Sequence, residues 1–117
     1  MTKRLQREQV KEFKLYESTI LTKKWDVYVP YVQHFSGGVK HRLKKVSYGA
    51  KGMSDYTIHH DVDRRSRYRN RHINDHIDDP YKAGFWSMWH LWGRSSDSKK
   101  AFKQAVNKAK RLLMKYT

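Results

Sequence analysis

Three of the four tryptophans of this chain lie within residues 84–92, and this aromatic block most constrains the fold. The block reads Gly-Phe-Trp-Ser-Met-Trp-His-Leu-Trp. Only 38% of the 117 residues are hydrophobic whereas 14% are aromatic, so the core has to be built largely from rings. Stacking on bases and insertion at a membrane interface are alternative uses of such a cluster. We expect a core instead, formed by Phe85, Trp86, Trp89 and Trp92.

The positive charge is the next constraint. The chain has 26 Lys and Arg against 11 Asp and Glu, a net charge of +15 and a pI of about 10.1. Self-repulsion of this size weakens an isolated fold, so we expect an anionic partner: nucleic acid, an acidic protein surface or an anionic membrane face. The absence of cysteine excludes disulfides and Cys nucleophiles and fits a reducing intracellular compartment. We expect neither a secretory signal nor a transmembrane segment.

The first half of the chain predicts a β-hairpin over residues 22–50, after an arm over residues 1–20. In the arm, Val10, Phe13 and Tyr16 are loosely helical in spacing, which fits a short helix or an arm that becomes ordered on a partner. Residues 25–32 alternate as in a strand, and Pro30 indicates an edge strand or a strand end. Gly37 and Gly38 indicate the turn. The returning strand carries a basic face, formed by Lys40, Arg42 and Lys44.

Residues 62–73 predict a cationic helix, with Asp61 and Asp63 at its N-terminus. Residues 55–57 form either a third strand or a loop that leads into a helix. At 100° per residue, Tyr68 and His72 fall between two groups of arginines, which are Arg64, Arg67 and Arg71 on one side and Arg65 and Arg69 on the other. Residues 74–82 form a loop whose acids are expected to pair with neighbouring arginines; they are Asp75, Asp78 and Asp79.

Residues 96–116 predict an amphipathic helix capped by Ser96 or Asp97. Its apolar face repeats at helical spacing and consists of Phe102, Ala105, Val106, Ala109, Leu112, Leu113 and Tyr116. Its basic faces carry Lys99, Lys100, Lys103, Lys108, Lys110, Arg111 and Lys115. The chain therefore predicts a single α+β domain, with a small antiparallel sheet or hairpin, a central Arg-rich helix, a Trp-rich segment and this last helix.

Two groups of polar residues are candidates for a metal site or a catalytic site. Imidazole and carboxylate ligands suit Zn, Mn or Fe, and the possible ligands are His59, His60, Asp61, His72, Asp75 and His76. Their spacing matches no ligand motif, so we favour a structural network over a metal or catalytic site. The expected network consists of Asp55, Tyr56, His59, Asp61, Tyr68 and His72, with Arg64 beside it. For Asp55, Asp61 and Asp63, helix capping and salt bridges are favoured over general acid–base catalysis. We expect no cofactor.

The cationic surfaces are the strongest functional feature, because the charge exceeds what solubility requires. Contacts to phosphate would be insensitive to base sequence. The expected contacts to nucleic acid or an acidic partner are Lys40, Arg42, Lys44, Arg64, Arg65, Arg67, Arg69, Arg71, Lys99, Lys100, Lys103, Lys108, Lys110, Arg111 and Lys115.

The central region resembles a family of small uncharacterised basic proteins of large eukaryotic double-stranded DNA viruses and some phages. The resemblance covers residues 48–92 and rests on Tyr48-Gly49, on Asp55-Tyr56-Thr57-x-His59-x-Asp61-x-x-Arg64-Arg65-x-Arg67-Tyr68-x-x-Arg71-His72, and on Gly84-Phe85-Trp86-Ser87-x-Trp89-x-Leu91-Trp92. This chain departs from the pattern at Tyr48, where Phe is more usual, and in its longer basic C-terminal helix. The resemblance assigns no catalytic residue.

The resemblance implies a viral protein of the virion. Combined with the charge, it predicts a non-enzymatic structural protein of a large DNA virus, a minor capsid or core component that contacts other virion proteins or packaged DNA. A sequence-independent nucleic-acid-binding protein in replication, packaging or genome condensation is the alternative. A small metal-dependent nuclease centred on His59, Asp61 and His72 is the weaker third hypothesis.

Overall fold

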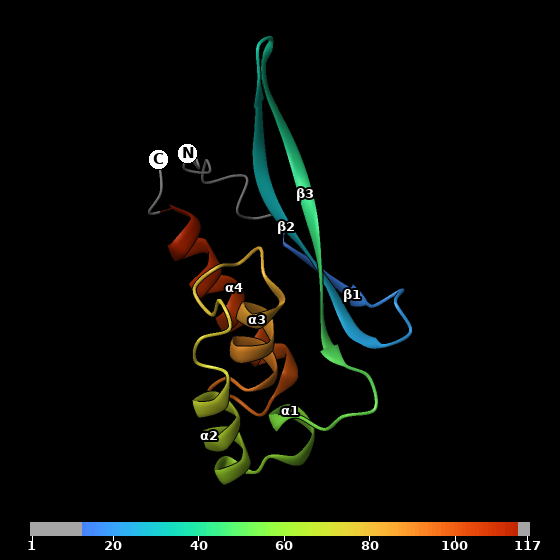
Figure 1. The fold of residues 1–117 in the computed structure, drawn as a ribbon, viewed down its shortest axis with the longest axis vertical. Helices are drawn as coiled ribbons and strands as arrows, with labels where there is room; N and C mark the ends of the chain where they lie inside the picture. The colour runs from blue at the N-terminus through green and yellow to red at the C-terminus, as the bar shows by residue number, and fades with distance from the viewer. Residues whose placement is uncertain (1–12, 115–117) are drawn as a thin grey trace.

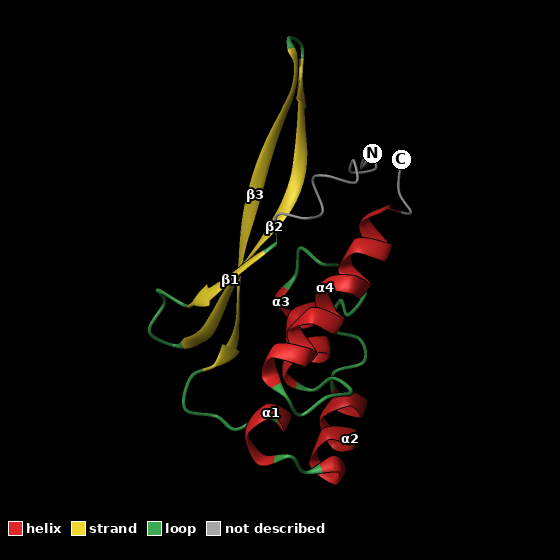
Figure 2. Ribbon diagram, turned by 180° about the vertical axis from the view of Figure 1, so that it is seen from behind, coloured by secondary structure: helices red, strands yellow, loops and turns green. Residues whose placement is uncertain are grey.

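A three-stranded antiparallel sheet forms one side of the molecule, and a group of helices packs against it (Figures 1 and 2). This computed structural model describes residues 13–114. The strand order is β1-β2-β3, with β1 at Lys14–Glu17, β2 at Lys23–Phe35 and β3 at Gly38–Ala50. The helices are α1 (Tyr56–His59), α2 (Val62–Arg71), α3 (Ala83–Trp86), the π-helix η2 (Ser87–Leu91) and α4 (Ser98–Met114). The predicted α+β class is confirmed.

The hairpin prediction is also confirmed. Strands β2 and β3 pair in one continuous register, from Lys23 opposite Ala50 to Phe35 opposite Gly38. A two-residue connection joins them, and Gly38 has a φ of 137°, which favours glycine.

The strand β1 corrects one expectation and restricts another to part of β2. A helix was one possibility for the segment that contains Phe13 and Tyr16, but residues 14–17 form a strand that pairs with residues 25–28 of β2. Strand β2 is therefore the central strand there, not an edge. Pro30 lies beyond the end of this pairing, and there β3 is the only partner strand of β2 within residues 13–114, which fits the missing N–H of proline. Residues 1–12 of the predicted arm lie outside the described residues.

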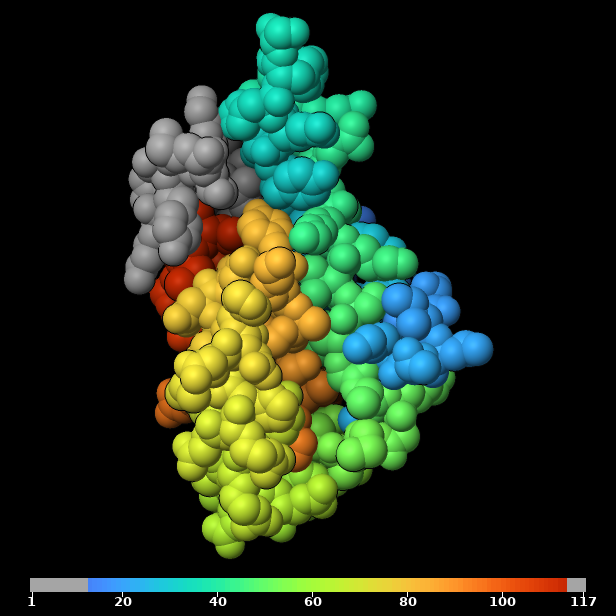
Figure 3. All heavy atoms as spheres, in the orientation of Figure 1, coloured from blue at the N-terminus to red at the C-terminus, as the bar shows by residue number. Residues whose placement is uncertain are grey.

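The distal half of the hairpin projects past the helices as a β-arm, which we define as residues 31–44 (Figure 1). From Gln33 to Lys45 all side chains are exposed. The arm contributes to a long molecule with principal extents of 50 × 29 × 23 Å. In the space-filling view its tip forms the upper end of the molecule (Figure 3).

The core lies where the half of the sheet away from the β-arm meets α3, η2 and α4. Val27, Val29 and Tyr48 from the sheet pack with Phe85 and Trp86, and all five are fully buried. Helix α4 contributes Ala101, Ala105, Ala109 and Leu113 as its buried face. Small alanines let this helix approach the bulky rings closely, so the core combines large and small side chains.

The aromatic-core prediction is confirmed for three residues and needs a correction for Trp89. Phe85, Trp86 and Trp92 are buried, whereas Trp89 is half-buried and packs against the buried core. The π-helical turn of η2 closes with the Trp92 N–H donating to the Ser87 carbonyl at 3.1 Å. Its wider turn departs from a simple helical repeat, so residues 89 and 92 do not share one environment.

The helix boundaries agree closely with the predicted ones. Helix α2 starts at residue 62 as predicted and ends at residue 71, and α4 spans residues 98–114 within the predicted 96–116. The Asp61 carboxylate caps α2, and Asp97 caps α4 through the Lys100 amide. Of the two alternatives for residues 55–57, the loop into a helix is correct, because Asp55 caps α1. No helix within residues 13–114 is long and apolar enough to cross a membrane.

Candidate functional site

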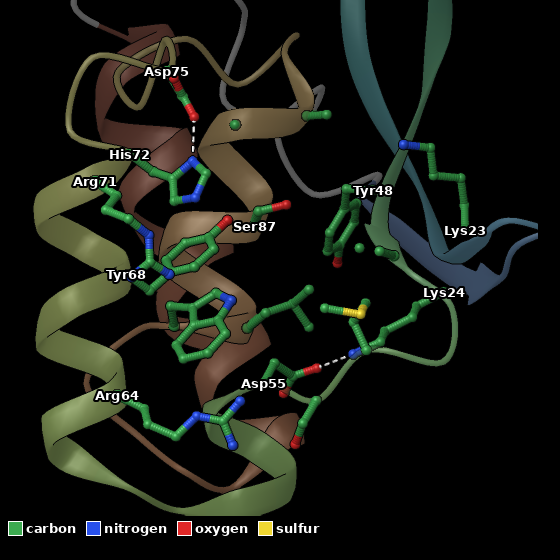
Figure 4. Close-up of a pocket in the computed structure, with 18 of the residues that line it drawn as sticks. Lys23, Lys24, Tyr48, Asp55, Arg64, Tyr68, Arg71, His72, Asp75 and Ser87 are labelled. Atoms are coloured by element: carbon green, nitrogen blue, oxygen red, sulfur yellow. Dashed lines mark hydrogen bonds and ion pairs between the residues drawn. The ribbon is translucent and has the colours of Figure 1, made fainter.

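A cleft of about 700 Å³ opens between α2 and the lower end of the sheet (Figure 4). One wall is α2, and the opposite wall is formed by the start of β2, the end of β3 and the loop that follows it. The aromatic block of residues 84–92 forms the floor of the cleft through Ser87, Leu91 and Trp92. The cleft therefore lies between segments that are far apart in sequence.

The wall formed by α2 is cationic. Arg64, Arg67 and Arg71 recur at intervals of three and four residues, so they share one face of the helix, and that face lines the cleft. Across from them lie Lys23 and Lys24 of β2. The two predicted groups of arginines on α2 are thus separated in space as expected.

Three stacked rings lie along the same side of α2. The Tyr68 and Trp92 rings are almost parallel, with centroids 4.2 Å apart and an interplanar angle of 7°. The His72 ring stacks on Tyr68, with centroids 4.1 Å apart. Burial raises the pKa of the Tyr68 hydroxyl. In Figure 4, His72 lies above Tyr68 at the outer end of this stack.

Two carboxylates line the cleft, and both already contact side chains of the protein. Asp55 is buried and accepts a hydrogen bond from the Lys24 ammonium at 2.5 Å, which ties the start of α1 to β2. The same carboxylate caps α1 through the Thr57 amide at 2.9 Å. Asp75 contacts Nδ1 of His72 at 2.5 Å. Arg64, Arg67, Arg71 and Lys23 form no ion pair with any other residue in the 13–114 range.

Arg64, Arg67 and Arg71 have no acidic partner within residues 13–114, because most of the carboxylates there bind backbone amides instead. Asp61 accepts from the backbone amides of Asp63 and Arg64. Asp79 accepts from that of Tyr81, and Asp97 from that of Lys100. Asp26 accepts from the Thr19 amide and from the hydroxyls of Ser18 and Ser47. The expectation that Asp75, Asp78 and Asp79 pair with arginines is therefore wrong, since these acids form no ion pair with an arginine among the described residues.

The other two arginines of α2 face aromatic rings outside the cleft. The guanidinium of Arg65 lies 5.3 Å from the centre of the Tyr56 ring, and that of Arg69 lies 5.1 Å from the Trp89 ring. Lys108 of α4 approaches the same indole at 4.3 Å. Trp89 thus links α2 to α4 through two cations.

Among the residues of the predicted structural network, the His59 ring packs against Tyr56 and against Trp92, and Trp92 in turn stacks on Tyr68. The link between a helix and the hairpin is the Asp55–Lys24 pair. Tyr68 and His72 contribute stacked rings, Tyr56 lies beneath Arg65, and Asp61 caps α2. The Nδ1 atom of His59 accepts from the Asp61 amide at 2.8 Å, and burial lowers the pKa of this imidazole.

The possible metal ligands are spread over different surroundings. His59 and His72 each use Nδ1 within the protein, while His60 and His76 are exposed and have positive φ. Within residues 13–114, no three His, Asp or Glu side chains are grouped so that they could hold a metal ion.

The remaining predicted contact residues lie on two further surfaces. Lys40, Arg42 and Lys44 are exposed on the β-arm, and their positions in the register put them on the sheet face that carries Val46 and Tyr48. On α4, Lys99, Lys100, Lys103 and Arg111 are exposed and Lys108 and Lys110 are half-buried. Lys115 and Tyr116 lie outside the described residues.

The sequence interpretation missed the wall opposite α2. Lys23 and Lys24 precede the alternating part of the strand and carry no local motif, and Trp92 was assigned to the core only. A pair of lysines at the start of a predicted strand was the available signal.

A family model described as a family of unknown function (DUF5754) matches residues 13–72, which are 60 of the 117 residues, so the chain belongs to this family. The match spans the sheet, α1 and α2, and it includes Lys23, Lys24, Arg64, Arg67 and Arg71. No curated protein and no solved structure is significantly similar to the chain.

Proposed function

We propose that this member of DUF5754 is a non-enzymatic protein that binds nucleic acid through its phosphates, without base-sequence specificity, as a structural component of a DNA virus particle. The observation that carries the nucleic-acid part is the unpaired positive charge around the cleft. Five Lys or Arg side chains line it against two carboxylates, and four of those five cations have no acidic partner among the described residues.

The rest of the cationic surface supports the same proposal. The β-arm adds a two-stranded ribbon with three exposed cations, a shape that the major groove of DNA can admit. Exposed Lys and Arg side chains can move to fit a run of phosphates of any sequence, and they release counterions on binding. These features favour contacts to the nucleic-acid backbone rather than to base edges.

The test is the salt dependence of binding. We expect the protein to bind unrelated 20-base-pair duplexes with equal affinity in a fluorescence anisotropy titration. If about four phosphates are contacted, raising the salt from about 50 to about 200 mM should weaken binding by about a hundredfold. Arg64→Gln/Arg67→Gln/Arg71→Gln should bind more weakly and with a smaller salt slope.

Two results would overturn the nucleic-acid part. One is the absence of binding at about 0.1 M salt, where the Debye length is still about 10 Å. The other is equal or tighter binding to polyglutamate, which would identify an acidic protein surface as the partner. A duplex with a neutral phosphate analogue is the matched control, because it removes charge and keeps shape.

The virion part is supported by the motif resemblance over residues 48–92 and has a separate test. Mass spectrometry of purified particles should find the protein in a fixed ratio to the capsid proteins. Its absence from particles, with the protein present in infected cells, would point instead to a role in replication or packaging.

A further inference from the structure

The size of the cleft restricts which form of nucleic acid can occupy it. A volume of about 700 Å³ falls in the range of about 300–1,000 Å³ that is typical of sites for small molecules. The bases of a duplex lie inside the stack and reach a protein ring only when they are unpaired or flipped out. The occupant that fits is therefore one or two unpaired nucleotides.

We propose that this cleft is a binding site for unpaired nucleotides, with phosphates held by Arg64, Arg67 and Arg71 and a base stacked on His72. The proposal rests on the proposed nucleic-acid binding and deepens it, because it assigns one site and one form of ligand. It predicts that single strands, overhangs and strand ends bind better than a closed duplex.

The arginines are arranged to hold phosphate. Side chains three and four residues apart on a helix have Cβ atoms about 5–6 Å apart, so two neighbouring guanidinium groups can contact one phosphate together. Each guanidinium offers several N–H donors in a planar fork that matches phosphate oxygens. Arg64, Arg67 and Arg71 are exposed and unpaired within the described residues, so no internal ion pair has to break first.

The stacked rings supply a surface for a base. Tyr68 is covered by Trp92 and by His72, whereas His72 is at the outer end of the stack and its side chain is 36% exposed. The Asp75 contact at Nδ1 fixes the orientation of the ring. A ring held in place loses little freedom when a base stacks on it, and such stacking tolerates any base.

The experiment compares two triple variants with the same change in charge. The cleft variant is Arg64→Gln/Arg67→Gln/Arg71→Gln. The control variant replaces three exposed cations outside the cleft, and is Lys40→Gln/Lys44→Gln/Lys103→Gln. Each is titrated with a 12-nucleotide oligothymidylate and with a duplex of equal phosphate number at one salt concentration. All six side chains are exposed, so both variants should fold, which a thermal melt verifies.

We expect the wild-type protein to bind the single strand at least about tenfold more tightly than the duplex. The cleft variant should lose this preference, and the control variant should keep it while binding both ligands more weakly. His72→Ala should reduce single-strand binding about tenfold and leave duplex binding unchanged. His34→Ala, on the face of the arm opposite Lys40 and Lys44, is the matched control for loss of an imidazole and should change neither.

Other outcomes separate this inference from the proposed function. Equal losses in the two triple variants, with no single-strand preference, would overturn the cleft site and leave the nucleic-acid function standing. Binding of neither oligonucleotide would overturn both. Binding of free thymidine 5′-monophosphate, lost in the cleft variant but without oligonucleotide binding, would support the site and overturn the nucleic-acid function.

Discussion

Buried polar side chains hold the core together at the scale of single residues. His90 is fully buried, and its Nδ1 lies 2.6 Å from the hydroxyl of Tyr48 while its Nε2 lies 3.0 Å from that of Ser98. These two hydrogen bonds of His90 join η2 to β3 and to the first turn of α4. The Tyr48 hydroxyl provides the hydrogen-bond partner that a buried imidazole needs.

The buried imidazole predicts that stability falls in mild acid. Burial lowers the pKa of His90 from its ordinary value of 6.5 to about 4. The unfolded chain therefore binds a proton between these values that the folded protein does not, so the free energy of unfolding decreases as the pH falls from 6.5 to 4. At about 1.4 kcal/mol per pKa unit, the loss approaches 3 kcal/mol. Urea unfolding at a series of pH values measures it.

The matched variant for this prediction is His90→Gln. The amide can accept from Tyr48 and donate to Ser98, but it does not titrate. Its free energy of unfolding should depend less on pH between 6.5 and 4 than that of the wild-type protein. The same dependence in both proteins would assign the effect to other groups, such as His59, whose pKa burial also lowers.

At the scale of elements, hydrogen bonds from aromatic side chains hold the polar loop between α2 and α3 in place. The Trp86 indole donates to the carbonyl of Pro80 and the Trp89 indole to that of Ile77, both at 2.7 Å. Tyr81 donates to the carbonyl of Pro30 at 2.9 Å, which fastens the loop to the sheet. The aromatic block thus holds the segment that carries Asp75 beside the cleft.

At Gly84 the backbone of α3 lies close to the loop backbone at Asp75. A Cβ added there would lie 1.7 Å from the Asp75 carbonyl oxygen, so backbone would have to move. We expect Gly84→Ala to lower the free energy of unfolding by about 3 kcal/mol. Gly37→Ala is the control, because its Cβ would meet only the exposed ring of Phe35 at 3.2 Å. Equal stability of the two variants in urea would contradict the close approach.

The molecule as a whole consists of a compact body and a projecting β-arm. No side chain from residue 33 to residue 45 is buried, so the distal arm should contribute little to stability. Replacing residues 33–40 with Asn-Gly, a favoured two-residue turn, keeps the pair Val32–His41 at the new end. We expect the melting temperature to change by only a few degrees. A large drop in a calorimetric scan would show that the arm supports the body.

The sequence by itself determined the elements whose patterns are local. Alternation over residues 25–32 and a Gly-Gly turn are enough for a hairpin, and helical spacing with Asp61 and Asp97 as caps is enough for α2 and α4. The separation of the α2 arginines into two groups also follows from the helical period.

Only the tertiary structure decided which of these groups meet. The sequence shows Lys24 and Asp55 at a distance of 31 residues, and Tyr68 and Trp92 at 24, with no local signal that they pair. Residues 14–17 became a strand because β2 offered an open edge, a contact that outweighs their weak helical spacing. The binding partners of the carboxylates mattered most for the cleft. Backbone amides bind most of the described carboxylates, and Arg64, Arg67 and Arg71, which have no acidic partner among the described residues, line a cleft.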